Sequence, residues 1–298
     1  MGHGLPLTWT ELKKEFDAYA GSAAIEEALL HFYEALFQIW YSNRDRVEIA
    51  FIFKPEQIRD SLREGRFLLS GQKPPFDAAF YREILAEVVA AAVEHFPETA
   101  ALQEALHLEE LQGDRPLLMA MEITSLNEVQ LAHFFSSQQW FAEAGVEPAQ
   151  AAFLLAAALK PFYISLAAAI AAQTDFSFWR EGCCPVCGHM PSMALLRAED
   201  GARILECGQC HAQWQFGRLE CPFCRNRDFQ QLRHFSIDEF PGRRVQVCEC
   251  CKGYLKTVLG KEMGRRVTLE LDNIFTVELD LVARREGYQP GGDLVLPR

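Results

Sequence analysis

Residues 183–224 read CCPVCGHMPSMALLRAEDGARILECGQCHAQWQFGRLECPFC, and residues 248–251 read CECC. These stretches contain four Cys-x-x-Cys pairs: Cys184/Cys187, Cys207/Cys210, Cys221/Cys224 and Cys248/Cys251. A Cys-x-x-Cys turn places two thiolates on one side of a tight backbone knuckle, so two such knuckles can surround one tetrahedral metal ion. The pattern therefore predicts two four-cysteine metal sites.

The spacing between the pairs favours sequential pairing along the chain. Cys187 and Cys207 are separated by 19 residues, which is within the range of zinc ribbons, and Cys224 and Cys248 are separated by 23. An alternative joins the second pair to the third and lets the outer pairs meet. This alternative ranks second, because the residues between the paired knuckles would then lie outside the metal sites, although their sequences are suited to connect two knuckles of one site.

Each of those intervening sequences has the pattern of a β-hairpin. Residues 193–197 and 203–207 flank a turn at 198–201, and residues 232–237 and 243–247 flank a turn at 238–242. Sequential pairing therefore gives each metal site one hairpin that carries its two knuckles.

Four thiolates in a tetrahedron suit either zinc or a rubredoxin-like iron. Closed coordination leaves no open position for a substrate, and most such sites are structural. The sequence has no G-x-G-x-x-G, P-loop, G-x-S-x-G or H-E-x-x-H motif. We therefore predict two iron or zinc ions and no enzyme activity.

The remaining cysteines and nearby histidines are predicted to be outside the ligand set. Cys183 and Cys250 adjoin ligands but break the x-x spacing, and we interpret them as spare thiols that could replace a neighbour. His189, His211 and His234 lie near the knuckles but not at knuckle positions.

The first 178 residues have helical periodicity. Apolar residues recur at helical spacing in residues 23–40, 76–96, 125–144 and 148–172, whereas residues 47–75 are less periodic and predict connecting structure with a short helix near 55–64. A further helix is predicted over residues 271–286. The fold class is thus α+β: a helical N-terminal domain, residues 1–178, and a small β-rich domain, residues 179–298, with two tandem rubredoxin- or zinc-ribbon-like four-cysteine sites and a C-terminal helix.

Charge and hydropathy predict a soluble, cytoplasmic protein. The N-terminus lacks a signal sequence, and the most apolar stretch, residues 151–172, has Lys160 and Pro161 at its middle, which favours buried helices over a membrane span. Residues 1–178 contain 12 Lys and Arg against 25 Asp and Glu, a net −13, and residues 179–298 contain 17 against 16, a net +1. This balance argues against a nucleic-acid partner and is compatible with a basic protein partner.

The C-terminal region resembles the formate dehydrogenase accessory protein family, FdhE. The resemblance lies in residues 179–188 (WREGCCPVCG), 201–207 (GARILEC), 221–224 (CPFC) and 248–256 (CECCKGYLK), and upstream in residues 158–162 (ALKPF). It covers roughly half of the chain, and residues 1–145 match mainly in helical character. One departure is Arg225, which follows the third knuckle where a glycine is common in the family.

The resemblance implies a cytoplasmic accessory protein that acts in the maturation of formate dehydrogenase. Such a protein is expected to bind the catalytic subunit, including its twin-arginine signal segment, before export, and to carry rubredoxin-like iron at the cysteine motifs. An alternative is a thiol or iron electron-transfer protein that acts on the same partner enzyme.

Overall fold

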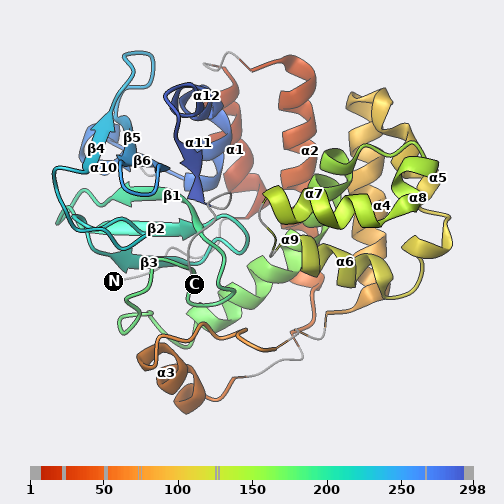
Figure 1. The fold of residues 1–298 in the computed structure, drawn as a ribbon, viewed down its shortest axis with the longest axis horizontal. Coiled ribbons are helices and arrows are strands. Elements are labelled where there is room, and N and C mark those ends of the chain that lie inside the picture. The colour runs from red at the N-terminus through yellow and green to blue at the C-terminus, as the bar shows by residue number, and fades with distance from the viewer. Residues whose placement is uncertain are drawn as a thin grey trace. The chain divides into compact units, whose positions relative to one another are not determined.

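A computed structural model describes residues 8–21, 25–49, 53–72, 74, 76–124, 126, 128–265 and 267–291. The chain forms two compact units, each assembled from separate segments of the sequence (Figure 1). The helical unit consists of residues 6–51 and 74–165, and the cysteine unit consists of residues 1–5, 52–73 and 166–298. The boundaries of these units do not lie at residue 178, where the sequence predicts a domain boundary. That boundary remains a prediction about which segments fold independently.

The helical unit is built from amphipathic helices that bury one face each. Its helices are α1 Trp9–Ala20, α2 Glu27–Asn43, α4 Ala78–His95, α5 Ala100–Ala105, α6 Arg115–Ile123, α7 Glu128–Ser137, α8 Gln139–Glu143 and most of α9 Pro148–Ala171, with 3-10 turns η1 Arg44–Arg46, η2 Pro97–Thr99 and η3 Glu109–Leu111. Thr8 begins α1 with a capping box, in which its hydroxyl accepts a bond from the Glu11 N–H and the Glu11 carboxylate accepts one from the Thr8 N–H. The predicted start of the second helix at residues 22–24 lies outside the described residues.

Helix α9 continues through a proline because a side chain replaces the lost hydrogen bond. Pro161 has no N–H, so the carbonyl of Ala157, four residues earlier, lacks its usual helical partner. The indole Nε1 of Trp40 donates to that carbonyl at 2.8 Å, and the ammonium of Lys160 lies 4.6 Å from the Trp40 ring. Trp40 thus compensates for both residues that are least compatible with a bilayer: it binds the carbonyl that Pro161 leaves without a partner, and its ring contacts Lys160.

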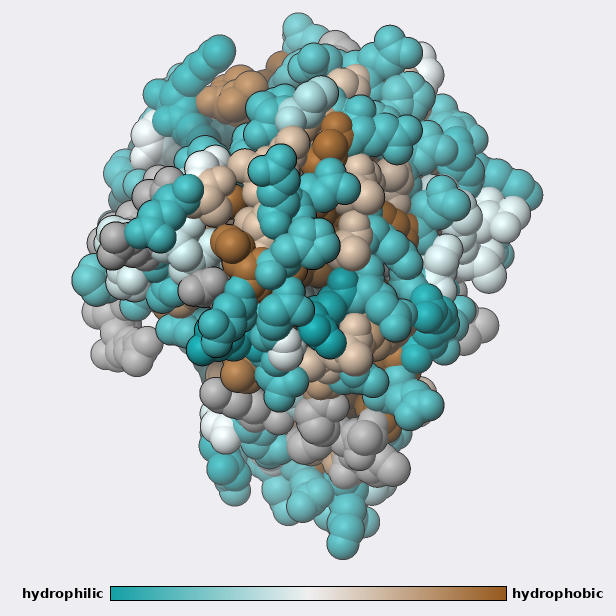
Figure 2. Space-filling model, turned by 90° about the vertical axis from the view of Figure 1, so that its right-hand side faces the viewer, coloured by the Kyte–Doolittle hydropathy of each residue, from teal (hydrophilic) through white to brown (hydrophobic). Residues whose placement is uncertain are grey.

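Of the helices in the described ranges, α9 alone is long and apolar enough to cross a membrane, and 67% of its most apolar window is buried inside the protein. That degree of burial is typical of a core helix, as the sequence predicts. Figure 2 shows a face on which hydrophilic side chains predominate and apolar ones gather near the middle.

The cysteine unit contains one mixed sheet. Its strands are β1 Pro191–Leu196, β2 Arg203–Cys207, β3 Gln213–Phe216, β4 Leu232–Phe235, β5 Arg243–Cys248, β6 Gly253–Leu259 and β7 Gln289–Pro290, and its helices are α3 Pro55–Arg63, α10 Gly260–Met263, α11 Leu269–Phe275 and α12 Val277–Arg285. The main strand order is β3-β2-β1-β6-β5-β4, with β7 added beside β6.

The sheet is assembled from two similar halves. Within each half the strands are antiparallel, as β1-β2-β3 and β4-β5-β6. The halves meet where β1 pairs with β6 in parallel, with Met193 opposite Lys256 and Leu196 opposite Leu259. Both predicted hairpins, β1–β2 and β4–β5, are present, whereas β3, β6 and β7 were not predicted.

One face of the sheet is covered by the C-terminal helices. Val245, Val247 and Tyr254 form an apolar cluster with Leu279 and Ala283 of α12. The predicted C-terminal helix is present as α11 and α12, which are separated at Thr276. The short helix predicted near residues 55–64 is α3, and the α+β class with its two cysteine clusters is confirmed.

Residues 179–183 lead into the first knuckle, and contacts with β3 and with the third knuckle hold them in place. The indole of Trp179 donates to the carbonyl of Cys183 at 2.8 Å, and the indole of Trp214 donates to the carbonyl of Glu181 at 3.2 Å. Gly182 lies so close to the third knuckle that a Cβ there would be 1.7 Å from the carbonyl oxygen of Pro222. Only glycine fits this contact.

We expect Gly182→Ala to lower the free energy of unfolding by about 3 kcal/mol or more, because a backbone atom must move to admit the methyl group. Gly21→Ala is the control, since Gly21 has a φ of −67° and its Cβ would be 3.7 Å from the nearest atom, the Asp17 carbonyl oxygen. Urea unfolding of both variants measures the difference. Equal stability of the two variants would contradict the assigned role of Gly182.

Candidate metal centres

The four Cys-x-x-Cys knuckles share one backbone geometry. The residue after the second cysteine has a positive φ in every case: 80° at Gly188, 56° at His211, 64° at Arg225 and 59° at Lys252. The N–H of each of these residues donates to the carbonyl of the first cysteine of its knuckle, at 2.8 to 3.1 Å. The left-handed conformation therefore turns the chain back at the same point in each knuckle, although only Gly188 adopts it without steric cost. Arg225 departs from glycine in sequence but not in conformation.

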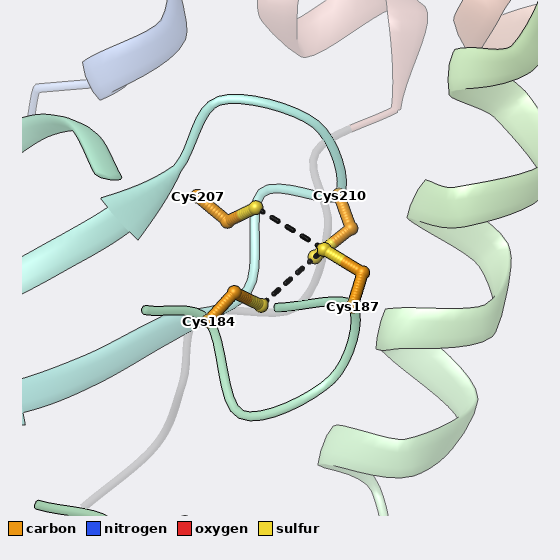
Figure 3. Close-up of side chains that lie close together, drawn as sticks. All are labelled: Cys184, Cys187, Cys207 and Cys210. Carbon is orange, nitrogen blue, oxygen red and sulfur yellow. Dashed lines mark hydrogen bonds between the residues drawn. The ribbon is translucent and has the colours of Figure 1, made fainter. Parts of the chain in front are cut away.

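The knuckles bring the eight cysteines into two groups of four. One group contains Cys184, Cys187, Cys207 and Cys210, and the other contains Cys221, Cys224, Cys248 and Cys251; within each, all sulfur atoms lie within 4.8 Å of one another. Figure 3 shows the first group, with sulfurs from two loops pointing toward a common centre. The grouping is sequential, so the alternative that joined the second pair to the third is wrong.

The sulfur positions fit a tetrahedral ion better than they fit disulfides. In the first group Cys184 and Cys210 have sulfurs 3.4 Å apart, and Cys187 has its sulfur 3.5 Å from Cys207 and from Cys210. A tetrahedral zinc with bonds of about 2.3 Å to sulfur requires edges of about 3.8 Å. A disulfide requires about 2.05 Å. Each group can therefore hold one metal ion, and the chemistry of four sulfurs suits zinc or iron.

Backbone N–H groups donate to the sulfurs of the knuckles. The N–H of Val186 lies 3.4 Å from the sulfur of Cys184, and that of Gln209 lies 3.4 Å from the sulfur of Cys207. Such bonds offset the negative charge that thiolates bring to a buried site.

The four adjacent sulfurs of the second group oppose one another's ionisation. A hydrogen bond from Cys251 lowers the pKa of Cys221 to about 5, against the opposing effect of burial. The same bond raises the pKa of Cys251 far above its usual range, and burial raises that of Cys224 to about 12. One thiolate therefore forms at the expense of its neighbours, and ionisation of all four requires a positive ion among them.

The two groups differ in their exposure to solvent. All four cysteines of the first group are buried, whereas Cys224 and Cys251 of the second are half-buried. A segment distant in sequence encloses the first group: the N–H groups of Leu68 and Leu69 donate to the carbonyls of Pro185 and Val186 at 2.9 and 3.0 Å. A Cβ at Gly188 would lie 2.8 Å from the ring of Phe67. This contact could not be predicted, because residues 66–69 carry neither a cysteine nor a periodic pattern.

The other residues singled out in the sequence lie outside both groups. Cys183 is half-buried, with its pKa raised to about 12 by burial, and Cys250 is exposed. The Nε2 atom of His211 lies 2.8 Å from the Glu270 carboxylate. The described residues form no further cluster of metal-ligating side chains besides the two cysteine groups.

Comparisons with known proteins all find FdhE proteins as relatives. Residues 183–218 match the model described as "FdhE, central domain". A protein FdhE homolog from Aquifex aeolicus (strain VF5) is 30% identical over 169 residues, covering 56% of this chain and 58% of the relative. A second, from Yersinia enterocolitica, is 28% identical over 205 residues, covering 65% of this chain and 64% of the relative. The chain is thus similar to FdhE proteins, and most specifically to their central domain.

The sequence similarity to these relatives covers only part of the chain. The matches span less than two thirds of the length of these FdhE relatives. The crystal structure of the FdhE protein from Pseudomonas aeruginosa has the same fold, with a TM-score of 0.60 at 21% identity, covering 94% of this chain and 93% of that one. The fold is thus shared along nearly the whole chain.

We expect metal release to occur in two phases, because the half-buried sulfurs of the second group are open to a thiol reagent and the buried sulfurs of the first are not. Cys224→Ser should remove the fast phase and Cys187→Ser the slow phase, each leaving about one metal ion per chain. These cysteines hold equivalent positions in their groups, so each variant controls for the other. Transfer of metal to a coloured chelator after addition of a mercurial measures both phases. A single phase, or the reverse assignment, would contradict the difference in access.

Proposed function

We propose that this chain is a cytoplasmic, non-catalytic accessory protein that holds one metal ion in each four-cysteine group and binds the catalytic subunit of formate dehydrogenase before its export. The observation that carries the proposal is the pair of four-sulfur clusters in a chain that is similar to FdhE proteins. The eight cysteines are the proposed ligands: Cys184, Cys187, Cys207, Cys210, Cys221, Cys224, Cys248 and Cys251. Four protein ligands fill the coordination of a tetrahedral ion, so such a site supports structure rather than turnover of a substrate.

The distribution of charge supports recognition of a basic partner by the helical unit. Residues 6–51 and 74–165 contain 7 Lys and Arg against 21 Asp and Glu, a net −14, and the remaining residues contain 22 against 20, a net +2. A field of this sign attracts a basic segment, such as a twin-arginine signal, and raises the association rate. The same field disfavours nucleic acid.

Neutralising exposed acidic residues of the helical unit should weaken binding of the catalytic subunit. The variant Glu98→Gln/Glu104→Gln/Asp114→Asn removes three exposed charges from this unit. The control, Glu56→Gln/Glu199→Gln/Asp60→Asn, removes three exposed charges from the cysteine unit. We expect the first variant to bind about 3- to 10-fold more weakly through a slower association rate, and the control to be unchanged.

Binding kinetics measured with the catalytic subunit at low and physiological ionic strength provide the test. The association rate of the unaltered protein should fall as salt rises. If binding is unaffected by salt and by both sets of substitutions, the electrostatic part of the proposal fails. If no binding occurs at any ionic strength, the accessory role itself fails.

A second candidate function, electron or thiol transfer to the partner enzyme, is favoured by one feature. Cys224 and Cys251 of the second group are half-buried, so a reductant or partner thiol has access to them. A redox role requires iron or a metal-free dithiol, whereas a structural role is compatible with zinc.

Metal analysis and a visible spectrum of anaerobically purified protein separate these candidates. Two colourless zinc ions per chain would exclude the redox candidate and leave the accessory role. Ferric–thiolate colour that bleaches on reduction, and is lost with Cys221→Ser but kept with Cys184→Ser, would place a redox-competent iron in the second group.

A further inference from the structure

A cavity of about 260 Å³ lies against the face of the sheet opposite the C-terminal helices. Cross-strand partners share a face, and the register places Gln246 opposite Leu255, both of which line this cavity. Arg244, two residues along β5 from Gln246, shares the same face, and Arg203 of β2 also lines the cavity. The neighbours Val245 and Tyr254 point to the other face, where they contact α12.

The lining of this cavity is strongly cationic. It contains Arg203, Arg218, Arg244 and His234, and Arg233 borders it from β4, where its pairing with Val247 places its side chain on the other face. Among the lining residues that the structure describes, Glu220 is the single carboxylate. We call this cavity the arginine pocket.

Glu220 balances only part of the charge of the arginine pocket, because two other arginines also bind it. Its Oε1 lies 2.5 Å from the Nε of Arg225, and its Oε2 lies 3.1 Å from Arg227. Neither Arg225 nor Arg227 lines the cavity. The guanidinium groups of Arg203, Arg218 and Arg244 therefore share the pocket, and Glu220 and Cys221 offset only part of their charge.

Two of these guanidinium groups have donors that the protein leaves unused. Arg203 is 3% exposed, and its NH1 donates to the carbonyls of Gly217 and Glu220, but its Nε is buried with no hydrogen-bond partner in the described part of the chain. The Nε of Arg244 is likewise buried and unpartnered within the described ranges. Burial and then the charge of Arg244 lower the pKa of Arg203 to about 10, and burial and then the charge of Arg218 lower the pKa of Arg244. Buried donors without acceptors are costly, and their convergence from two strands points to a missing ligand.

We propose that the arginine pocket binds a small molecule through a phosphate group. A phosphate carries up to two negative charges and three acceptor oxygens at neutral pH, which match several converging guanidinium donors. A carboxylate has one charge and two oxygens, and leaves more of the cluster unbalanced. The cavity volume admits a phosphate with a small substituent and is below that of sites for drug-sized ligands.

The location connects this pocket to the second four-cysteine group. Cys221 and Cys248 of that group line the arginine pocket, as do Pro222 and Phe223 between the cysteines of the third knuckle. The carbonyl that Arg203 holds at 2.9 Å belongs to Glu220, the residue before Cys221. A bound phosphate therefore lies against the wall of the metal site and stiffens the segment that carries it.

The test is calorimetric titration of the metal-loaded full-length protein at constant ionic strength. The probes are inorganic phosphate, phenyl phosphate as a monoester, and acetate. We expect saturable binding of both phosphates, and binding at least about tenfold weaker in Arg218→Gln/Arg244→Gln, because charge-assisted bonds are lost. Arg197→Gln is the control, since Arg197 pairs with Asp200 on the surface and does not line the pocket. Metal content, measured on each variant, shows that the fold is retained.

The outcomes decide between the possible sources of the ligand. Tighter binding of phenyl phosphate than of inorganic phosphate identifies a phosphorylated molecule as the occupant, and the reverse order identifies free phosphate. Acetate that binds as tightly as phosphate, equal loss in the Arg197 control, or no saturable binding in the unaltered protein would each overturn the proposal. None of these results bears on binding of the formate dehydrogenase subunit, so the two proposals fail separately.

Discussion

The cysteine unit depends on holding four sulfurs within 4.8 Å of one another at two places. Four thiols in so small a space can ionise together only if a cation lies among them, and the opposed pKa shifts of Cys221 and Cys251 express that conflict. A metal ion removes the conflict and turns each quartet into a crosslink between two knuckles. Such a site contributes on the order of 10 kcal/mol to the folding of a small domain. This contribution adds to that of the apolar clusters between the sheet and the C-terminal helices.

The two crosslinks do not act separately, because the halves of the sheet share contacts. Parallel pairing of β1 with β6 joins the hairpin of one site to the last strand of the other. The approach of Gly182 to Pro222 and the bond from Arg225 to the Arg180 carbonyl, at 2.6 Å, tie the entry of the first knuckle to the third. The WREG sequence before the first cysteine pair is therefore explained by packing: Trp179 is buried, Arg180 and Glu181 supply carbonyls, and Gly182 admits a neighbouring backbone. Loss of one metal ion therefore loosens the backbone beside the other site, although the other four sulfurs still hold their own ion.

The features that could be predicted from the sequence are the local ones. A knuckle is specified within five residues and a hairpin within about fifteen, so their positions follow from the sequence, and the spacing favours the sequential grouping that the structure has. The parallel β1–β6 pairing could not be predicted, because it joins strands about sixty residues apart and neither strand carries a signal for its partner. The cover that residues 66–69 place over the first knuckle is made by backbone N–H groups, which every residue but proline possesses. The arginine pocket has the same origin: Arg203, Arg218 and Arg244 are unremarkable in sequence, and only the strand register and the third knuckle bring them together.

The two proposed kinds of recognition do not compete, because they rest on different distributions of charge. The net −14 of the helical unit is spread over exposed helices, where solvent and salt weaken each charge, so it acts on the rate at which a basic partner arrives. In the arginine pocket Arg203 is almost fully buried and Arg244 is half-buried, so a direct bond from either to an anion is strong and little screened. Long-range attraction therefore belongs to the helical unit and short-range anion binding to the cysteine unit. Because Cys221 and Cys248 form part of the pocket wall, the occupancy of the pocket and the rigidity of the second metal site are physically linked, whereas the buried first site is set by its own four sulfurs and the backbone that covers them.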